Sequence, residues 1–236
     1  MDTIEIKGVE IKGLRLDLPS EQQLSTLPLA WDDDANHQIC FLDTPGFFAA
    51  KRPGGYASML KSADLVLSKS PRLSARVARV ASACAASGKS LSLRCVNIAS
   101  RHKEYVSFFG QPEESKTLNI VYKPLSVLSS MLSTLEEHKG SLFLIGGREA
   151  CLARAEANLR ATFPALRIVG RSQGDFYGKE ALVLRALQKA SPDLVLLGSK
   201  VKERELWIPR TMRFTKSAIF FYESSIIETL AGLGKK

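Results

Sequence analysis

The chain has 236 residues, of which 45% are hydrophobic, and it carries a formal net charge of +9 with a pI near 9.5. A chain of this length and composition can bury a sizeable core, so we expect a folded globular protein with one large α/β domain or two small ones. No run of about 18 apolar residues occurs, and the acidic start MDTIEIKGVE lacks the pattern of a signal peptide. We therefore expect no transmembrane helix and a cytoplasmic location.

The excess of basic residues favours an anionic partner, either nucleotide phosphates, acidic lipid headgroups or nucleic acid, unless it serves only solubility. Nucleic acid is the least favoured of these partners because the chain has no RNP, zinc-finger or helix-turn-helix signature. The four cysteines form no CxxC pair and the three histidines form no metal-binding motif. We expect buried free thiols, no metal site and no cofactor.

The start of the chain differs in pattern from the rest. Polar and apolar residues alternate in residues 3–18, which predicts an antiparallel hairpin at the edge of a sheet. Residues 19–38 are acidic and rich in turn-forming residues. We therefore expect residues 1–37 to be an N-terminal extension and residues 38–236 to form the main domain.

From residue 38 onwards, short apolar runs alternate with helical patterns. Apolar residues recur at helical spacing in residues 126–138 and again from Leu152 to Phe163. Strands and helices in turn predict an α/β fold, with a mostly parallel sheet and helices on both of its faces. The predicted strands are QICFLD, ADLVLS, SLSLRCVNI, TLNIVY, SLFLIG, LRIVG, PDLVLLG and SAIFFY.

The segment RHKEYVSFFGQPEESK, residues 101–116, interrupts this alternation. Its charges, together with Gly110 and Pro112, predict an exposed loop.

Ligands of an open parallel sheet bind beyond the carboxyl ends of its strands. The loops that follow four of the predicted strands are therefore the candidates for a site. These loops are DTPGFF after Leu42, SKSPRLS after Leu67, GGREA after Ile145 and GSKVKERELW after Leu197.

The two glycines of the GGREA loop could bind a ligand or could simply form a tight turn. Gly146 and Gly147 join a strand to a helix, where backbone N–H groups can approach a diphosphate, and Arg148 could add charge. A Gly-Gly pair is more often simply a tight turn, and the GxGxxG pattern is absent.

Aromatic residues near the later loops are open to two interpretations. In GRSQGDFYGKE, residues 170–180, an aromatic ring could stack on a nucleobase, or Phe176 and Tyr177 could cap the core while Asp175 starts the next helix. Trp207 lies in a helix predicted to start near Glu203, where a tryptophan is more often part of the core than a platform for a ligand. The spacing does not decide between these roles.

The order of the later segments resembles the WecG/TagA/CpsF glycosyltransferases over roughly residues 140–210. The family pattern is an apolar strand ending in Gly-Gly, a helix, YP-x-L-x-I-V-G, a G-Y-F loop and D-L-L-x-V-G-x-G-x-P-K-Q-E-x-W. ADLVLSKSPRLSARVARV is similar to the family's A-D-L-V-L-x-D-G-x-G-x-V-x-A-A-R, and FLDTPGFF takes the place of its T-x-N-x-E strand end. Matching positions of the later half are Gly146, Gly147, Pro164, Gly170, Gly174, Phe176, Asp193, Gly198, Glu205 and Trp207.

The resemblance implies a Rossmann-like core and an inverting transfer of an N-acetylmannosamine-type sugar from a UDP donor to a lipid-linked acceptor, in cell-envelope polysaccharide synthesis. It also implies a carboxylate that acts as general base on the acceptor hydroxyl, and cations or N–H donors that stabilise the departing diphosphate. No metal is implied. The substrate-binding residues that it implies are Thr44, Lys69, Gly146, Gly147, Gly174, Phe176, Gly198, Arg204, Glu205 and Trp207.

The chain departs from the family where the catalytic aspartate is expected. That position is Lys69, which cannot serve as a carboxylate base. Either the chain is a divergent transferase with its base elsewhere, at Asp43 or Asp64, or it is a catalytically degenerate member that keeps the fold as a nucleotide-sugar-binding or protein-interaction module. Lys69, Arg72 and Arg204 would then hold phosphates or form a solvated basic rim.

The C-terminal segment places Arg210, Arg213 and Lys216 ahead of an apolar strand and a short helix. The resemblance implies a peripheral contact with an anionic membrane through this segment, at the inner membrane surface. The alternative is that a last strand and helix complete the sheet.

Overall fold

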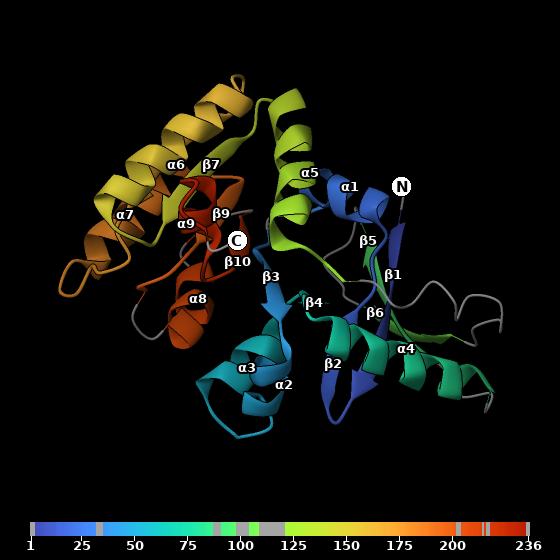
Figure 1. Ribbon diagram of the computed structural model, residues 1–236. Coiled ribbons are helices and arrows are strands. Elements are labelled where there is room, and N and C mark those ends of the chain that lie inside the picture. Colours follow the sequence, from blue (N-terminus) through green and yellow to red (C-terminus); the bar gives the residue numbers. More distant parts are fainter. Residues whose placement is uncertain are drawn as a thin grey trace.

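The computed structural model describes residues 3–31, 35–86, 91–97, 104–108, 121–201, 204–213, 215 and 218–234, with the backbone alone for residues 3, 85, 91–97, 104–108 and 204–206. Within this part the chain forms a six-stranded sheet and a four-stranded sheet (Figure 1).

The six-stranded sheet is parallel throughout, in the order β4-β3-β10-β9-β7-β8. Because its strands share one direction, the loops that follow them gather at one edge. The predicted α/β fold with a Rossmann-like parallel sheet is thereby confirmed. The strands are β3 (His37–Leu42), β4 (Leu65–Ser68), β7 (Ser141–Ile145), β8 (Arg167–Ser172), β9 (Leu194–Leu197) and β10 (Ile219–Tyr222).

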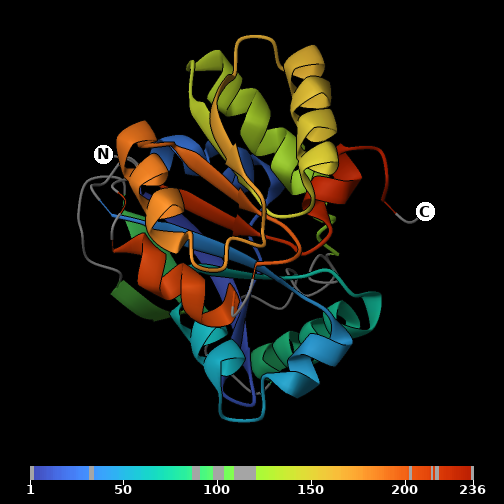
Figure 2. The same ribbon diagram turned by 90° about the vertical axis from the view of Figure 1, so that its left-hand side faces the viewer.

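Helices cover both faces of this sheet (Figure 1, Figure 2). Alternate strand residues point to opposite faces, so Phe221 belongs to one core cluster while Phe220 and Tyr222 belong to another. The first cluster includes residues of α1, α5, α6 and α9, and the second includes residues of α2, α3, α4, α7 and α8. The helices are α1 (Glu21–Ala30), α2 (Thr44–Ala49), α3 (Gly55–Ser62), α4 (Pro71–Ala86), α5 (Pro124–Glu137), α6 (Glu149–Thr162), α7 (Glu180–Ala190), α8 (Arg204–Met212) and α9 (Ile226–Leu230).

The second sheet is antiparallel, in the order β2-β1-β5-β6. It confirms the predicted N-terminal hairpin, in which the turn residues Lys12 and Gly13 have φ angles of 55° and 75° as a tight two-residue turn requires. Its strands are β1 (Thr3–Ile11), β2 (Leu14–Asp17), β5 (Leu91–Asn97) and β6 (Glu104–Phe108).

Three local predictions are corrected. Residues 19–38 are not turn-rich throughout, because α1 begins there with a capping box in which Ser20 and Gln23 bond each other's backbone N–H groups at 3.1 and 2.8 Å. Within the run SLSLRCVNI, residues Leu91–Asn97 form a strand, but it pairs with β1 and not with the parallel sheet. Part of residues 101–116 is strand β6, and most of TLNIVY lies outside the described residues.

The cysteine side chains that the structure describes, Cys40, Cys84 and Cys151, are free thiols. Cys40 is fully buried in β3, and this burial raises its pKa to about 12. The predicted buried thiol is confirmed at this position, while Cys84 and Cys151 are only partly buried. The side chain of Cys95 lies outside the described residues.

Candidate functional site

Two cavities lie against the loops that follow the parallel strands. The larger, here called the Lys69 cavity, has a volume of about 480 Å³ and is lined by Phe41, Asp43, Pro45, Gly46, Ala49, Tyr56, Lys69, Tyr222, Glu223 and Ser224. The smaller, here called the Trp207 cavity, has a volume of about 220 Å³ and is lined by Gly174, Phe176, Tyr177, Gly178, Glu180, Trp207 and Arg210.

The charged residues of the Lys69 cavity come from the ends of three neighbouring strands. Asp43 follows β3, Lys69 follows β4 and Glu223 follows β10, and these strands lie in the order β4-β3-β10. The N–H of Lys69 donates to the carbonyl of Leu42 at 2.9 Å, which continues the strand pairing one residue past β4. Parallel pairing therefore brings together three side chains that are far apart in sequence.

Lys69 is fixed by Glu223. Its Nζ lies 2.9 Å from Oε2 and 3.1 Å from Oε1 of Glu223, whose side chain is only 6% exposed. Ser225 also donates to Oε1, from its hydroxyl at 3.2 Å. A buried carboxylate needs such partners, so the ion pair holds the Lys69 ammonium in one place at the cavity wall.

Asp43 is the more accessible carboxylate of the Lys69 cavity. Its side chain is 44% exposed, its Oδ1 accepts the N–H of Gly46 at 2.8 Å as the N-cap of α2, and its Oδ2 lies 4.0 Å from Lys69 Nζ. Thr44 follows it, and the Thr44 hydroxyl lies 2.8 Å from that of Ser70. Asp43 thus has an oxygen turned to an ammonium and open to the cavity.

The second carboxylate considered from the sequence, Asp64, is not at this edge. It precedes β4, so it lies at the opposite edge of the sheet, buried, where Oδ2 accepts the N–H of Gln38 at 2.8 Å and Oδ1 is 3.5 Å from Nδ1 of His37. The prediction that Asp64 lies near the carboxyl ends of the strands is wrong. The residue before a strand lies at the amino end of that strand, and the residue after it lies at the carboxyl end, where the cavity is.

The glycines at the ends of β7 and β9 hold loops together. The N–H groups of Gly146 and Gly147 donate to the carbonyls of Ser172 and Ser199 at 3.0 and 2.9 Å. A Cβ on Gly146 would come within 2.9 Å of the Gly198 backbone, and one on Gly198 within 2.5 Å of the Ile227 side chain. The two N–H groups that were predicted to approach a diphosphate therefore already donate hydrogen bonds within the protein.

Gly174 belongs to the same set of packed loops. A Cβ there would lie 2.5 Å from the carbonyl oxygen of Ser199, so the loop after β8 rests directly on the loop after β9. Because Gly174 also lines the Trp207 cavity, this packing brings the aromatic residues that follow it against α8.

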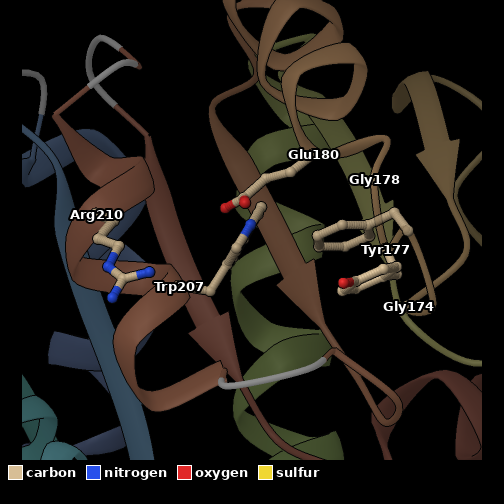
Figure 3. A pocket seen from close by; sticks show the side chains of 7 residues that line it. Gly174, Tyr177, Gly178, Glu180, Trp207 and Arg210 are labelled. Atoms are coloured by element: carbon tan, nitrogen blue, oxygen red, sulfur yellow. The ribbon is translucent and has the colours of Figure 1, made fainter.

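Trp207 is part of the core and also a wall of the Trp207 cavity. Its side chain is 3% exposed and its ring lies 5.4 Å from that of Phe176. Among the described residues its indole Nε1 has no hydrogen-bond partner, although a buried N–H normally has one. Figure 3 shows Glu180 extending toward the indole, with the ring of Tyr177 on the other side of the cavity from Arg210.

Four predicted site residues that the structure describes are not among those lining either cavity, namely Thr44, Gly146, Gly147 and Gly198. Two more cannot be placed. Arg204 and Glu205 begin α8, but their side chains lie outside the described residues. Glu223, which the sequence analysis did not single out, directly follows a strand, as Asp43 and Lys69 do, and that position was the signal that could have found it.

A comparison with family models decides the family. The model described as "Glycosyl transferase WecG/TagA/CpsF family" matches residues 115–236, just over half of the chain. The chain belongs to the WecG/TagA/CpsF family. No match was found among curated proteins.

The matched half of this WecG/TagA/CpsF chain contains the Trp207 cavity and Glu223, whereas Asp43 and Lys69 precede it. The family is one of glycosyltransferases, which use a nucleotide-sugar donor and a lipid-linked acceptor. No helix in the described part of the chain is both long and apolar enough to cross a membrane.

Proposed function

We propose that this chain transfers an N-acetylmannosamine-type sugar from a UDP donor to a lipid-linked acceptor in cell-envelope polysaccharide synthesis. The observation that carries the proposal is the Lys69 cavity, where an accessible carboxylate and a fixed ammonium lie 4.0 Å apart beyond the ends of parallel strands. Ligands of open parallel sheets bind at this edge.

Asp43 is the proposed general base. The acceptor hydroxyl attacks the anomeric carbon well only as its proton leaves, so a carboxylate must accept that proton. In this step Asp43 Oδ2 takes the proton, the hydroxyl oxygen bonds to the anomeric carbon from the face opposite the leaving group, and the bond from that carbon to the UDP oxygen breaks. The product has inverted configuration and UDP leaves with the electron pair.

Lys69 is the proposed cation for the departing diphosphate. An ammonium carries three N–H donors, so Lys69 can bind Glu223 and a phosphate oxygen at once. A cation that is already held in place needs no rearrangement as negative charge develops on the leaving group. Glu223 is in this proposal a positioning residue, because it acts on the substrate only through Lys69.

The Trp207 cavity is the proposed place of the nucleobase. Its volume of about 220 Å³ suits part of a ligand, and the rings of Phe176 and Tyr177 offer faces for stacking. The indole N–H of Trp207, which has no partner among the described residues, can donate to a base carbonyl. β8 is three strands from β10 in the sheet, roughly 14 Å. An extended nucleotide sugar can span such a distance along the Gly146 and Gly198 loops.

A second candidate function is that of a degenerate member that binds a nucleotide sugar or a protein without transfer. The presence of Lys69, locked to Glu223, at the position where the family resemblance places an aspartate favours this alternative. The two candidates differ in whether Asp43 acts on an acceptor.

The first experiment is a calorimetric titration with UDP and UDP-N-acetylmannosamine, followed by a transfer assay with a lipid-linked acceptor. Asp43→Asn is expected to lower transfer about 10²- to 10⁴-fold, the usual contribution of a general base, and to leave UDP binding unchanged. Glu137→Gln, an exposed carboxylate on α5, is the matched control. Trp207→Phe, which keeps a ring and removes the indole N–H, is expected to weaken UDP binding.

The outcomes separate the candidates. Full transfer by Asp43→Asn would refute its role as base. Binding of UDP without transfer or hydrolysis of any UDP-N-acetylhexosamine would support the degenerate member, and no binding of either nucleotide would refute the donor site.

A further inference from the structure

A cluster of cations surrounds one exposed aromatic ring beside the Lys69 cavity. This surface, here called the Phe48 surface, consists of Lys12, Phe48, Lys51 and Arg76. Lys12 lies in the β1–β2 turn, Phe48 and Lys51 lie in and after α2, and Arg76 lies in α4. These elements lie together in the lower part of the molecule in both ribbon views (Figure 1, Figure 2).

Aromatic contacts hold this surface together. Phe47 is buried and supports Phe48, whose ring is 5.8 Å away and 53% exposed. Lys51 Nζ lies 4.4 Å from the centre of the Phe48 ring, and Arg76 Cζ lies 5.5 Å from that of Phe47. An exposed ring thus lies at the surface with an ammonium over its face, and a guanidinium lies over the buried ring that supports it.

Within the part of the chain that the structure describes, the cations on this surface have no carboxylate partners. None of Lys12, Lys51 and Arg76 forms an ion pair with another described residue, and the three come from separate elements. Partial desolvation lowers the pKa of Lys51, and the neighbouring charges of Lys12 and Arg76 lower it further. Like charges that gather without an internal partner favour an external anion.

The position of the Phe48 surface relates it to the site. Pro45, Gly46 and Ala49 of α2 line the Lys69 cavity, and Phe48 lies in the same helix. Whatever binds the Phe48 surface therefore contacts the same short helix that lines the cavity in which we place the acceptor hydroxyl.

We propose that the Phe48 surface docks on an anionic lipid bilayer, with Phe48 inserted at the headgroup level and Lys12, Lys51 and Arg76 on lipid phosphates. Basic side chains around an apolar ring are the combination that binds anionic membrane surfaces. The role that we give to this docking, which is to bring a lipid-linked acceptor to the Lys69 cavity, rests on the proposed function. The docking itself does not depend on that function. It differs from the membrane contact predicted for the C-terminal segment, whose Ile226 and Ile227 are buried in the core.

Vesicle flotation tests the docking without any sugar transfer. The full chain is expected to bind vesicles of phosphatidylcholine mixed with phosphatidylglycerol, to bind phosphatidylcholine alone weakly, and to dissociate as salt is added. Each basic residue near an anionic surface contributes about fivefold in affinity, so Lys12→Glu with Lys51→Glu should weaken binding by about 25-fold or more. Phe48→Ser should weaken it several-fold at an unchanged charge.

Matched controls lie on α7, in another part of the molecule. Arg185→Glu with Lys189→Glu makes the same charge change at exposed positions, and Leu182→Ser removes an apolar side chain that is 61% exposed. These variants should bind vesicles nearly as the parent does, and circular dichroism should show all of them folded. Equal losses in the α7 and Phe48-surface variants, or none in either, would overturn the proposal.

The docking and the proposed function can fail separately. A chain that binds vesicles through the Phe48 surface but transfers no sugar keeps the docking and loses the transferase proposal. A chain that transfers sugar to a lipid-free acceptor analogue but binds no vesicle loses the docking alone. Binding of short DNA, but not of vesicles, to the Phe48 surface would replace the bilayer by a nucleic acid and refute the inference.

Discussion

At the scale of single residues, the position resembling the family's catalytic aspartate carries the opposite charge. Lys69 stands there, and Glu223 at the end of β10 compensates it at 2.9 Å. The pair is unequal, because the Lys69 side chain is 26% exposed and that of Glu223 only 6%. Removing the cation therefore leaves a carboxylate with little access to water, whereas removing the carboxylate leaves an ammonium that can turn outward.

This asymmetry gives a stability prediction. Lys69→Met should lower the free energy of unfolding by about 3 kcal/mol, and Glu223→Gln by about half as much. Lys69→Asp alone should be as damaging as Lys69→Met, because two carboxylates then face each other, and adding Glu223→Lys should restore most of the loss. Urea unfolding measures all four. If Lys69→Asp proves no less stable than the exchanged pair, the ion pair does not form in solution.

At the scale of elements, the glycine-containing loops after β7, β8 and β9 behave as one packed unit. Gly146, Gly174 and Gly198 allow three loops to touch through backbone atoms, and Ile227 of α9 closes the set. The glycines that the family resemblance implies for substrate binding thus have a structural role here.

The packing predicts which glycine is sensitive. Gly198→Ala puts a Cβ 2.5 Å from the Ile227 side chain, so it should cost about 1–3 kcal/mol of stability. Gly54→Ala meets no atom within 4 Å and should cost well under 1 kcal/mol. Thermal unfolding compares the two. Adding Ile227→Ala to Gly198→Ala should cost less than the sum of the single changes, and strict additivity would contradict the contact.

At the scale of the whole molecule, the N-terminal segment contributes to the main core. Leu27 of α1 is fully buried with residues of α5, the ring of Trp31 stacks on that of His37 at 4.4 Å, and the Tyr122 hydroxyl donates to the carbonyl of Pro19 at 2.9 Å. β1 also pairs with β5, which lies beyond residue 37. The proposed division at residue 37 therefore separates segments that share a core and a sheet.

We expect the proposed main domain to depend on this extension. A chain of residues 38–236 should be several kcal/mol less stable than the full chain, and Leu27→Ala in the full chain should cost about 2–5 kcal/mol, the usual effect of truncating a buried leucine. Urea unfolding of the full chain should show a single cooperative transition, and Leu27→Ala should shift the midpoint of that transition without splitting it. If residues 38–236 unfold as the full chain does, residues 1–37 are a dispensable addition.

Elements with a local signal could be predicted from the residues alone. The apolar runs within QICFLD and PDLVLLG predict strands of the parallel sheet, because a strand buried on both faces is apolar throughout. The helical spacing in residues 126–138 predicts α5, because burial of one stripe of a helix leaves a periodic pattern. The capping box of Ser20 and Gln23 is a local pattern that could have predicted the start of α1. The acidic, proline-containing segment around it led to the prediction of turns instead.

Features that depend on contacts between residues distant in sequence could not be predicted in this way. Strand β5 has an apolar pattern that suits either sheet, and its partner is β1. Glu223 completes the Lys69 cavity because parallel pairing of β10 beside β3 brings residues about 150 positions apart to one edge, a juxtaposition that no local pattern encodes. Periodicity records which side of an element is buried, whereas the register and order of the strands set which charges meet.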